Sequence, residues 1–529
     1  MNNYLNKISY KKNEKNLLIL FFCLFLSILA IKYLAIHLSF FLGDLPLAID
    51  EAQYFAWSKD LNFGYFSKPP FIAWILKANS VLFGENSHIY IRNLQPLAFA
   101  ISTIFVSLSS FEITKKKYPA ILTGFLFFLL PLSSFYSQFA TTDAWLLGFW
   151  SVSLYFFIKA TITNQKIYWI LCGITVGLGL LSKYSMVFFI FSALIYLILH
   201  KKLFKINPWL SFLVSMLVFS PNIVWNIQQR FPTFIHHAEM TNVNNRLLLS
   251  FQPVMEFFLG QFVVFGPLLF LLFLLLSFRI FFTAKFLKIH SSGSLFQIPI
   301  IFSWTILIFV LSLSFFGETE INWAAPASIG ICIAITSIFH QSELKFSNRL
   351  KIAINCLFTI SLVIHLIFLL CFISGPKLFK TYNKQNDPNI NPFLQVSGYQ
   401  NLVNIVLKKT KEKKNFLVIS EDRGILANMS IVFPSDKIRS WKKTSHIRHH
   451  WDLTQPLMQK DLKFEALLII KVNSLSLEHI SNVTNDLTSY FMDVRKVSDP
   501  ELDKIILQGK NNQKVMLFWI NENKRDYNL

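Results

Sequence analysis

The composition of this 529-residue chain excludes a soluble protein over most of its length. Hydrophobic residues make up 53% and charged residues only 15%, against roughly 25% charged residues in a globular protein. Phenylalanine alone occurs 57 times, and so many large apolar side chains need lipid as their solvent. The net charge of +21 indicates contact with anionic lipid or phosphate rather than nucleic acid, and the five cysteines form no disulfide or zinc pattern.

Eleven apolar runs have the character of membrane-spanning helices, which need roughly 20 apolar residues each. The first run follows a basic N-terminus, but it is too long for the apolar part of a signal peptide, so we expect a retained anchor. The runs are 17–38, 94–111, 119–138, 144–160, 167–181, 184–199, 208–225, 254–278, 296–315, 323–340 and 352–374.

Basic residues gather in alternate short loops, and the positive-inside rule places these loops in the cytoplasm. The stretch 167–199 has basic residues at both flanks, Lys166 and Lys201, so only two passes keep both flanks inside. This places Ser182-Lys183-Tyr184 at the opposite face. We therefore predict eleven spans, with a cytoplasmic N-terminus and the C-terminus on the opposite side of the membrane.

The chain changes character after residue 375, where polar residues replace the apolar runs. We expect a membrane domain over 1–375 and a small α/β domain over 376–529 on the outer side of the membrane. The segments predicted within the second domain are strands at Phe416–Ser420, Ala466–Lys471 and Val515–Ile520, and helices around 397–411 and 475–491.

The first outer loop, 43–92, holds the densest group of charges beside the membrane, where each charge is costly. Asp50 and Glu51 open the loop, and a carboxylate there is suited to act as general base on an acceptor hydroxyl or amine. Solvated loop charges are an equally good interpretation. Lys68 precedes two prolines and is suited to contact a lipid-linked phosphate, although snorkelling at a helix end is favoured for this lysine alone.

Other outer loops add weaker candidates. Asp143, in TTDAW, either complements a helix dipole or joins the acids of the first loop. Lys183, in LLSKYS, either snorkels or contacts phosphate. The remaining candidates, whose alternative is an ordinary loop or packing role, are Tyr54, Tyr65, Glu318, Asn322, His236 and His237 for substrate contacts and Arg246 for donor phosphate.

Two further motifs have simpler explanations. The glycines of GITVGLG, 173–179, lie inside a spanning run, where close helix packing explains them better than a dinucleotide site. The segment SHIRHHWDL, 445–453, has the residue density of a metal site, but a polar surface or an interdomain contact is favoured.

Five segments in register resemble the bacterial branch of the GT-C membrane glycosyltransferases. This branch includes the aminoarabinose transferase for lipid A, the lipopolysaccharide galacturonosyltransferases and relatives of the protein O-mannosyltransferases. The segments are DEAQYFAWS, GYFSKPPFIAW, TTDAW, GLGLLSKYS and NWAAPA, within roughly residues 45–330. EDRGILANMS and HHWDL resemble the C-terminal domain of some members.

The resemblance implies transfer of a sugar from a polyprenyl-phosphate carrier to an envelope acceptor, foremost lipid A or lipopolysaccharide, at the periplasmic face. Asp50 matches the catalytic first-loop acid, with Glu51 as its neighbour, and Asp143 matches the second outer-loop acid. Lys68 matches the lysine that contacts the carrier phosphate in the aminoarabinose enzyme, where many relatives have histidine. Lys183, Asn322 and Trp323 are weaker matches.

Several alternatives stay open at this point. Some relatives use a divalent metal and others do not, and the sequence does not decide whether the acids hold one. A lipid-linked-sugar transporter or flippase is a second class, although the acids cluster on one face rather than in mid-membrane. A non-catalytic protein of envelope assembly is a third class, for which Asp50 would be dispensable.

Overall fold

The computed structural model of the chain forms two compact units. The helical unit comprises Met1–Ser39, Lys68–Ile72 and Arg92–Ser374, and the α/β unit comprises Phe40–Ser67, Ala73–Ile91 and Gly375–Leu529. The domain boundary at residue 375 stays a prediction. The structure describes residues 2–42, 46–84, 88–240, 251–282, 293–317, 319–339, 348–382, 398–442, 446–458, 460–461, 464–472, 476–507 and 513–523.

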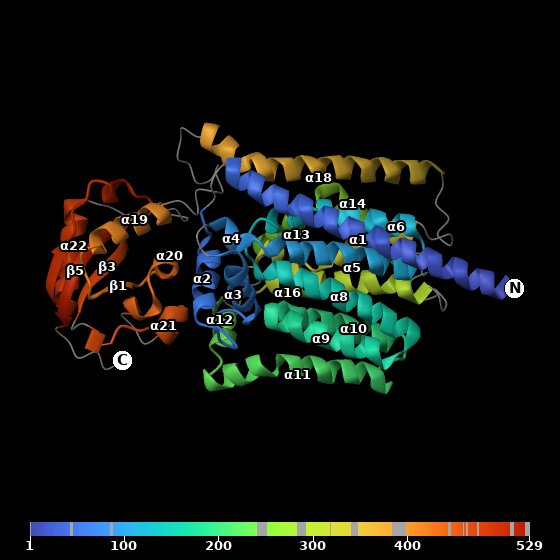
Figure 1. Cartoon of the computed structure of the whole chain (residues 1–529), viewed down its shortest axis with the longest axis horizontal. Coiled ribbons are helices and arrows are strands. Elements are labelled where there is room, and N and C mark those ends of the chain that lie inside the picture. Colours follow the sequence, from blue (N-terminus) through green and yellow to red (C-terminus); the bar gives the residue numbers. More distant parts are fainter. Residues whose placement is uncertain are drawn as a thin grey trace. The chain divides into compact units, whose positions relative to one another are not determined.

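Each apolar run predicted as a span is mainly helical in the described part of the chain, although the run 119–138 is divided at Leu130 into two helices (Figure 1). Long helices form there because lipid cannot satisfy backbone polar groups, so each segment has to pair its own. The helices are α1 (Asn2–Leu42), α5 (Gln95–Thr114), α6 (Lys117–Leu129), α7 (Pro131–Tyr136), α8 (Thr142–Thr163), α9 (Lys166–Ser182), α10 (Val187–Leu199), α11 (Ile206–Gln228), α12 (Pro232–Met240), α13 (Phe251–Val264), α14 (Pro267–Phe282), α16 (Gln297–Ser314), α17 (Ala327–Phe339) and α18 (Asn348–Tyr382), with 3-10 turns η1 (Tyr184–Met186), η2 (Gly293–Phe296) and η3 (Ile321–Ala324).

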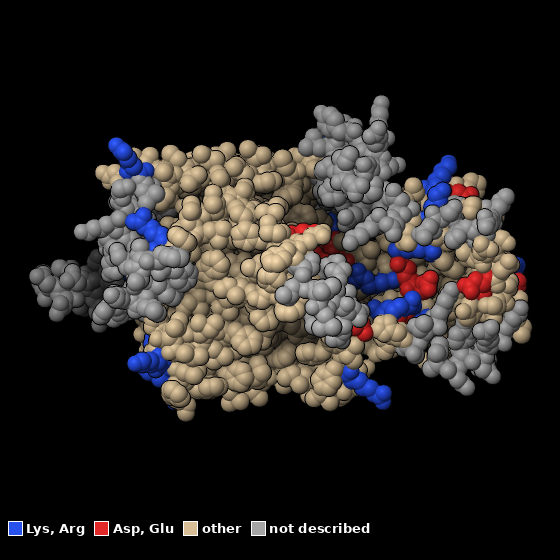
Figure 2. Space-filling view, turned by 180° about the vertical axis from the view of Figure 1, so that it is seen from behind, with Lys and Arg blue, Asp and Glu red and all other residues tan. Residues whose placement is uncertain are grey.

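The span count of eleven stays a prediction. Within the described residues, six helices are long and apolar enough to cross a membrane, and one bent pair would make a seventh. The other apolar helices of the helical unit, α6, α9, α10 and α17, are shorter. On the face drawn in Figure 2, uncharged side chains cover a broad stretch of this unit, and Lys and Arg gather at its end, as expected for a surface that contacts lipid.

The run predicted at 254–278 is not one straight span. It forms α13 and α14, which are bent by 110° at residues 265–266. Gly266 has a positive φ of 88° that favours glycine, and Pro267 begins the next helix because proline is tolerated in a first turn. A β-carbon at Gly266 would also collide with His365, so the sequence at the bend requires glycine.

Residues 167–199 form two helices, as predicted from their basic flanks. α9 ends at Ser182, Lys183 is extended, and α10 follows after one 3-10 turn. Two glycines of α9 face α11, where β-carbons at Gly173 and Gly177 would stand 2.5 and 2.8 Å from the carbonyl oxygens of Ser211 and Ser215, and Gly179 packs against Met186. The prediction that these glycines serve close helix packing is therefore confirmed.

The α/β unit is built on a five-stranded sheet in the order β2-β1-β3-β5-β4. The strands β1, β2 and β3 are parallel, and β5 runs antiparallel to both β3 and β4. The elements are α2 (Ile49–Lys59), α3 (Phe71–Phe83), α4 (His88–Arg92), α19 (Tyr399–Thr410), β1 (Phe416–Ser420), α20 (Arg423–Val432), η5 (Ser435–Lys437), β2 (Ile438–Ser440), α21 (His450–Thr454), β3 (Glu465–Val472), α22 (Leu477–Tyr490), β4 (Phe491–Lys496), η7 (Leu502–Lys504) and β5 (Lys514–Asn523).

The structure confirms the three predicted strands and both predicted helices of this unit. The strands were predictable because their apolar residues alternate or form a continuous run, as in a buried strand. Two strands were missed. β2 has only three residues, and β4 lies at the sheet edge with mostly exposed side chains, so neither carries a strong apolar pattern. The core beneath the sheet includes Ile419, Leu468 and Phe518.

Candidate active site

Glu51 fixes the start of helix α2. Its carboxylate oxygen Oε2 accepts a hydrogen bond of 2.9 Å from the backbone N–H of Ala48, and only 2% of the residue is exposed. The contact satisfies one of the N–H groups that a helix start leaves unpaired. Glu51 therefore has a clear structural role, whereas its neighbour Asp50 points elsewhere.

Asp50 is an exposed carboxylate that forms an ion pair with Arg423. The guanidinium Nη1 donates to Oδ1 of Asp50 at 2.9 Å and to Oε1 of Gln53 at 3.4 Å. The Asp50 side chain is 55% exposed and Arg423 is 44% exposed, so the pair faces solvent. Among the residues that the structure describes, Oδ2 of Asp50 accepts no hydrogen bond, which leaves one carboxylate oxygen for a substrate.

Helix α2 packs along α20, which carries Arg423. The ammonium of Lys59 donates to the carbonyl oxygens of Ser430 and Ile431, at 2.8 and 2.6 Å, near the C-terminal end of α20. At the other end, a β-carbon on Gly424 would lie 3.1 Å from Ile49 Cδ1, so glycine allows the two helices to approach closely. The Asp50 backbone is thus held against the C-terminal α/β fold.

Tyr54 and Tyr65, predicted as substrate contacts, are buried in this packing. The Tyr65 hydroxyl donates towards the carbonyl oxygens of Trp57 and Asp60, both at 3.0 Å, and its ring stacks on Trp57 at 4.5 Å. Burial raises the pKa of Tyr65, so the phenol stays neutral. Through these hydrogen bonds, Tyr65 stabilises the turn that follows α2.

The histidine-rich segment of the α/β unit is used for packing. The His450 ring lies edge-on to Trp57 and Tyr65, each at 5.5 Å between centroids, and its Nδ1 is buried without a hydrogen bond from the described residues. His449 contacts the carbonyl oxygen of Glu421 at 3.1 Å. No three His, Cys, Asp or Glu residues in the described part of the chain are arranged to hold a metal ion.

This packing predicts a loss of stability in acid. Burial lowers the pKa of His450 to about 3, whereas the unfolded chain takes up a proton near pH 6.5. Above pH 6.5 His450 is neutral in both the folded and the unfolded chain. As the pH falls from 6.5 towards 3, only the unfolded chain takes up the proton, so the free energy of unfolding decreases, by about 2–3 kcal/mol between pH 7 and 4.5. Unfolding of the full-length protein in detergent across this range measures the loss. His450→Phe, which keeps a ring but cannot titrate, should flatten the profile, and an unchanged slope would contradict the assignment.

Asp143, Lys183 and Asn322, all predicted site residues, meet in the helical unit. The Lys183 ammonium lies 2.7 Å from Oδ1 of Asp143, and Asn322 Nδ2 donates to Oδ2 at 3.4 Å. Their side chains are largely buried, with 14% of Lys183 and 8% of Asp143 exposed. Three segments that are distant in sequence, the start of α8, the break after α9 and η3, thus converge on one ion pair.

The Asp143–Lys183 pair has polar and aromatic neighbours. Tyr184, next to Lys183, donates to Oδ1 of Asn222 at 3.0 Å, and its ring lies edge-on to His237 at 6.1 Å. His236 and His237, on α12, have rings 5.8 Å apart, and both are half-buried. His237 therefore lies close to the Asp143–Lys183 pair, because it contacts Tyr184, the residue next to Lys183.

The remaining candidates are less defined. Lys68 is half-buried in the helical unit, in the segment between α2 and α3. Arg246 and Glu318 lie outside the described residues. Asp50 with Glu51 belongs to the α/β unit and Asp143 with Lys183 to the helical unit, so each acid is described within its own unit.

Arg423 is the site residue that sequence reasoning missed. It lies in EDRGILANMS, a segment that carried part of the resemblance, but nothing in its spacing connects it with Asp50, 373 positions away. Asp422 caps α20 by accepting from Ile425 N–H at 2.9 Å, which starts the helix at Arg423 and orients that side chain. The signals that were present are the resemblance of this segment and an acidic N-cap, Asp422, followed by a basic residue at the first position of a short helix.

Comparison with known proteins supports the resemblance seen in the motifs. Residues 67–225 match the model of a family described as dolichyl-phosphate-mannose-protein mannosyltransferase. The chain is 31% identical over 224 residues to the lipid A galacturonosyltransferase RgtD of Rhizobium johnstonii. The match covers 42% of this chain and 47% of that protein, so it spans about half of the curated relative.

The solved structure of ArnT from Cupriavidus metallidurans bound to undecaprenyl phosphate is similar over most of the chain. Its TM-score is 0.60 at 13% identity, covering 95% of this chain and 98% of ArnT. The apo form of ArnT gives a TM-score of 0.57 at the same identity, with 96% and 98% covered. The predicted resemblance to GT-C glycosyltransferases is confirmed, and so is a fold with many apolar helices and a C-terminal sheet.

Proposed function

We propose that this chain, whose residues 67–225 match the family described as dolichyl-phosphate-mannose-protein mannosyltransferase, is a membrane glycosyltransferase. In this proposal it moves a sugar from a polyprenyl-phosphate carrier to lipid A or lipopolysaccharide, at the periplasmic face of the bacterial inner membrane. The observation that carries the proposal is the 31% identity to a lipid A galacturonosyltransferase. The fold of ArnT, solved with undecaprenyl phosphate, supports the class of donor.

Asp50 is the proposed general base. A carrier phosphate is already a leaving group, so the reaction needs a base that deprotonates the acceptor while the acceptor attacks the anomeric carbon, with inversion. Asp50 suits this step because it faces solvent and Arg423 holds only Oδ1, while Oδ2 accepts no hydrogen bond from the part of the chain that the structure describes. Glu51 is less suited, since its buried carboxylate holds the start of α2.

The negative charge that develops on the departing phosphate needs a cation. Lys68 is our first candidate for this role, because it precedes two prolines in the first outer loop and matches the lysine that contacts the carrier phosphate in the family it resembles. We assign Asp143 and Lys183 to shaping the site in the helical unit, together with Asn322. Asp50 and Asp143 each bind a basic side chain, which does not fit a resident divalent metal, so the proposal contains no metal step.

The proposed function is tested by comparing lipopolysaccharide from cells with and without the gene by mass spectrometry. We expect the deletion to remove one hexose, uronic acid or amino sugar, and the wild-type gene to restore it. An unchanged lipid A and core would contradict the acceptor. Restoration by Asp50→Asn to the wild-type level would contradict catalysis through Asp50 and favour a transport or scaffold role.

Lys68→Ala should lower the transfer rate about 10²-fold, because the variant lacks the positive charge that stabilises the leaving phosphate. The measurement is transfer from a polyprenyl-phosphate sugar to lipid A in membranes containing equal amounts of each variant. Lys77→Ala is the matched control, since Lys77 lies on α3 of the same loop. Equal rates for the two variants would contradict the phosphate role of Lys68.

Arg423→Met should lower transfer roughly 10- to 100-fold by releasing Asp50 from its position. The fold should change little, because an exposed ion pair contributes at most about 1 kcal/mol. Lys59→Met is the control, since Lys59 also links α2 to α20 but does not touch Asp50. Arg423→Lys should recover part of the rate. If Lys59→Met lost as much activity as Arg423→Met, helix docking rather than Asp50 would be the cause.

A further inference from the structure

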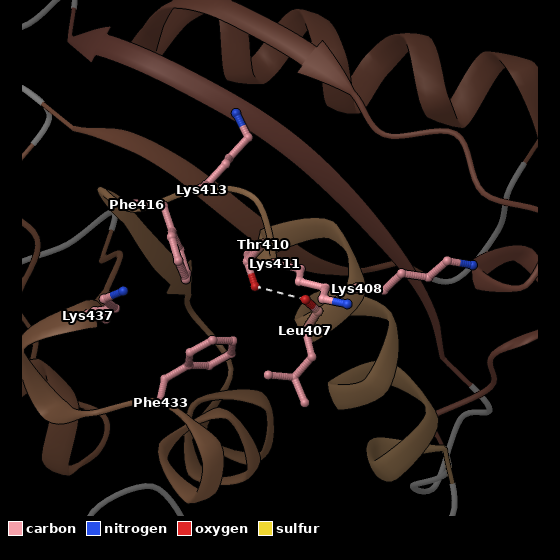
Figure 3. Close-up of a pocket in the computed structure, with 8 residues that line it drawn as sticks. All are labelled: Leu407, Lys408, Thr410, Lys411, Lys413, Phe416, Phe433 and Lys437. Carbon is pink, nitrogen blue, oxygen red and sulfur yellow. Dashed lines mark hydrogen bonds between the residues drawn. The ribbon is translucent and has the colours of Figure 1, made fainter.

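A basic pocket opens on the α/β unit where strand β1 begins. It has a volume of about 550 Å³ and lies between the end of α19, the start of β1, the end of α20 and η5 (Figure 3). The residues that line it are Leu407, Lys408, Thr410, Lys411, Lys413, Phe416, Phe433 and Lys437.

Half of this lining is lysine and none of it is acidic. Lys413 points away from the cavity, where it pairs with Glu465. Lys437 lies over the Phe416 ring, with its ammonium 4.3 Å from the centroid. Lys408 and Lys411 are exposed and form no ion pair with the described residues, but Asp499, which pairs with Lys409, also interacts electrostatically with Lys408, so the positive charge at the rim is only partly compensated.

Apolar side chains form the floor beneath these lysines. The rings of Phe416 and Phe433 meet edge to face at 5.7 Å, and Figure 3 shows Leu407 directed towards them. Leu407 is 39% exposed, as is Val432, the residue before Phe433. Apolar surface that stays exposed under a basic rim is typical of a site for an amphiphilic anion.

The helix dipole of α19 explains the position of only some of the lysines that line the pocket. Lys408 and Lys409 lie in the last turn of that helix, where a cation is stabilising. Lys411, however, follows the helix, and Lys437 comes from η5 on the other side of β1. The lysines that line the pocket therefore come from separate segments, and a bound anion would reduce the repulsion between their charges.

We propose that this pocket binds the phosphate-bearing headgroup of a membrane lipid. The lysines would meet the phosphate as point charges, and Leu407 with the two phenylalanines would contact the apolar part next to it. The pocket is separate from Asp50, because it lies at the start of β1 whereas Arg423 follows the end of that strand. Binding here goes beyond sugar transfer and does not depend on it.

The test uses full-length protein in detergent and two soluble probes, short-chain phosphatidylglycerol and monophosphorylated lipid A, with short-chain phosphatidylcholine as the zwitterionic reference. The pocket variant replaces Lys408, Lys411 and Lys437 by Gln. The matched control replaces three other exposed lysines of the same unit by Gln and so has the same net charge; they are Lys460, Lys496 and Lys504.

Each lysine near an anionic surface contributes about five-fold in affinity, so the pocket variant should bind its anionic probe about 100-fold more weakly at low salt, and the control within about three-fold of wild type. Lys411→Ala alone, which leaves the fold intact, should lose about five-fold in affinity for the anionic probe.

Weaker binding of both probes identifies bulk anionic lipid as the ligand, and weaker binding of lipid A alone identifies the acceptor headgroup. Equal binding by the pocket variant and the control, or equal affinity for phosphatidylcholine, would overturn the proposal. Because binding is measured without turnover, its failure is distinct from failure of the transferase assignment.

Discussion

Asp50→Asn is expected to reduce sugar transfer about 10²–10⁴-fold, the range typical for loss of a general base. The amide keeps the shape of the side chain and can still accept a hydrogen bond from Arg423, but it cannot take up a proton from the acceptor. Donor binding should change little, so the loss should appear in kcat rather than KM. Transfer from a polyprenyl-phosphate sugar to lipid A in membranes measures it.

The neighbouring acid supplies the control. Glu51→Gln makes the same chemical change one residue away, and its amide oxygen can still accept from the Ala48 N–H that Glu51 binds. We expect this variant to keep most of the activity and the wild-type thermal stability. If Glu51→Gln were as inactive as Asp50→Asn, the base would be shared by the two acids, and if neither lost activity, the catalytic role of this loop would be wrong.

Lys183→Met is expected to destabilise the helical unit by about 3–5 kcal/mol, because it leaves the buried carboxylate of Asp143 without its partner. Replacing both members, as Asp143→Asn with Lys183→Met, should restore most of this loss, since no buried charge then remains. Asn at 143 still offers an oxygen to Asn322. Unfolding in mixed micelles, compared between the single and the double variants, measures the coupling.

The control for this pair is Lys166→Met, at the exposed first position of the same helix, α9. It should change stability by less than about 0.5 kcal/mol, as surface substitutions usually do. If the double variant were as unstable as Lys183→Met, the ion pair would not be the cause. A stable Lys183→Met would show that the contact with Asp143 contributes little to stability, and contact with phosphate would then be the better explanation of Lys183.

The helices and the C-terminal sheet were predictable because their signals are local. A helix in lipid needs a long run of apolar residues, and a buried strand needs a short run or an alternating pattern. The runs of the helical unit and strands such as Ala466–Lys471 therefore stand out in the sequence. The break at Lys183 followed from charge on both flanks of one long run. The bend at Gly266 was missed because it interrupts a run that stays apolar on both sides.

The sequence alone determined which residues are candidates for the chemistry, while the tertiary structure decided how they are paired. Asp50, Asp143 and Lys183 were recognisable because a charge beside lipid is costly and is retained only for a purpose. Their partners were not recognisable, since an ion pair depends on which helix ends meet in space rather than on spacing along the chain. Thus Arg423 reaches Asp50 only because α20 packs along α2, and Lys183 turns out to bind Asp143. The fold likewise separated Asp50 from Glu51, because one faces solvent and the other holds the start of a helix.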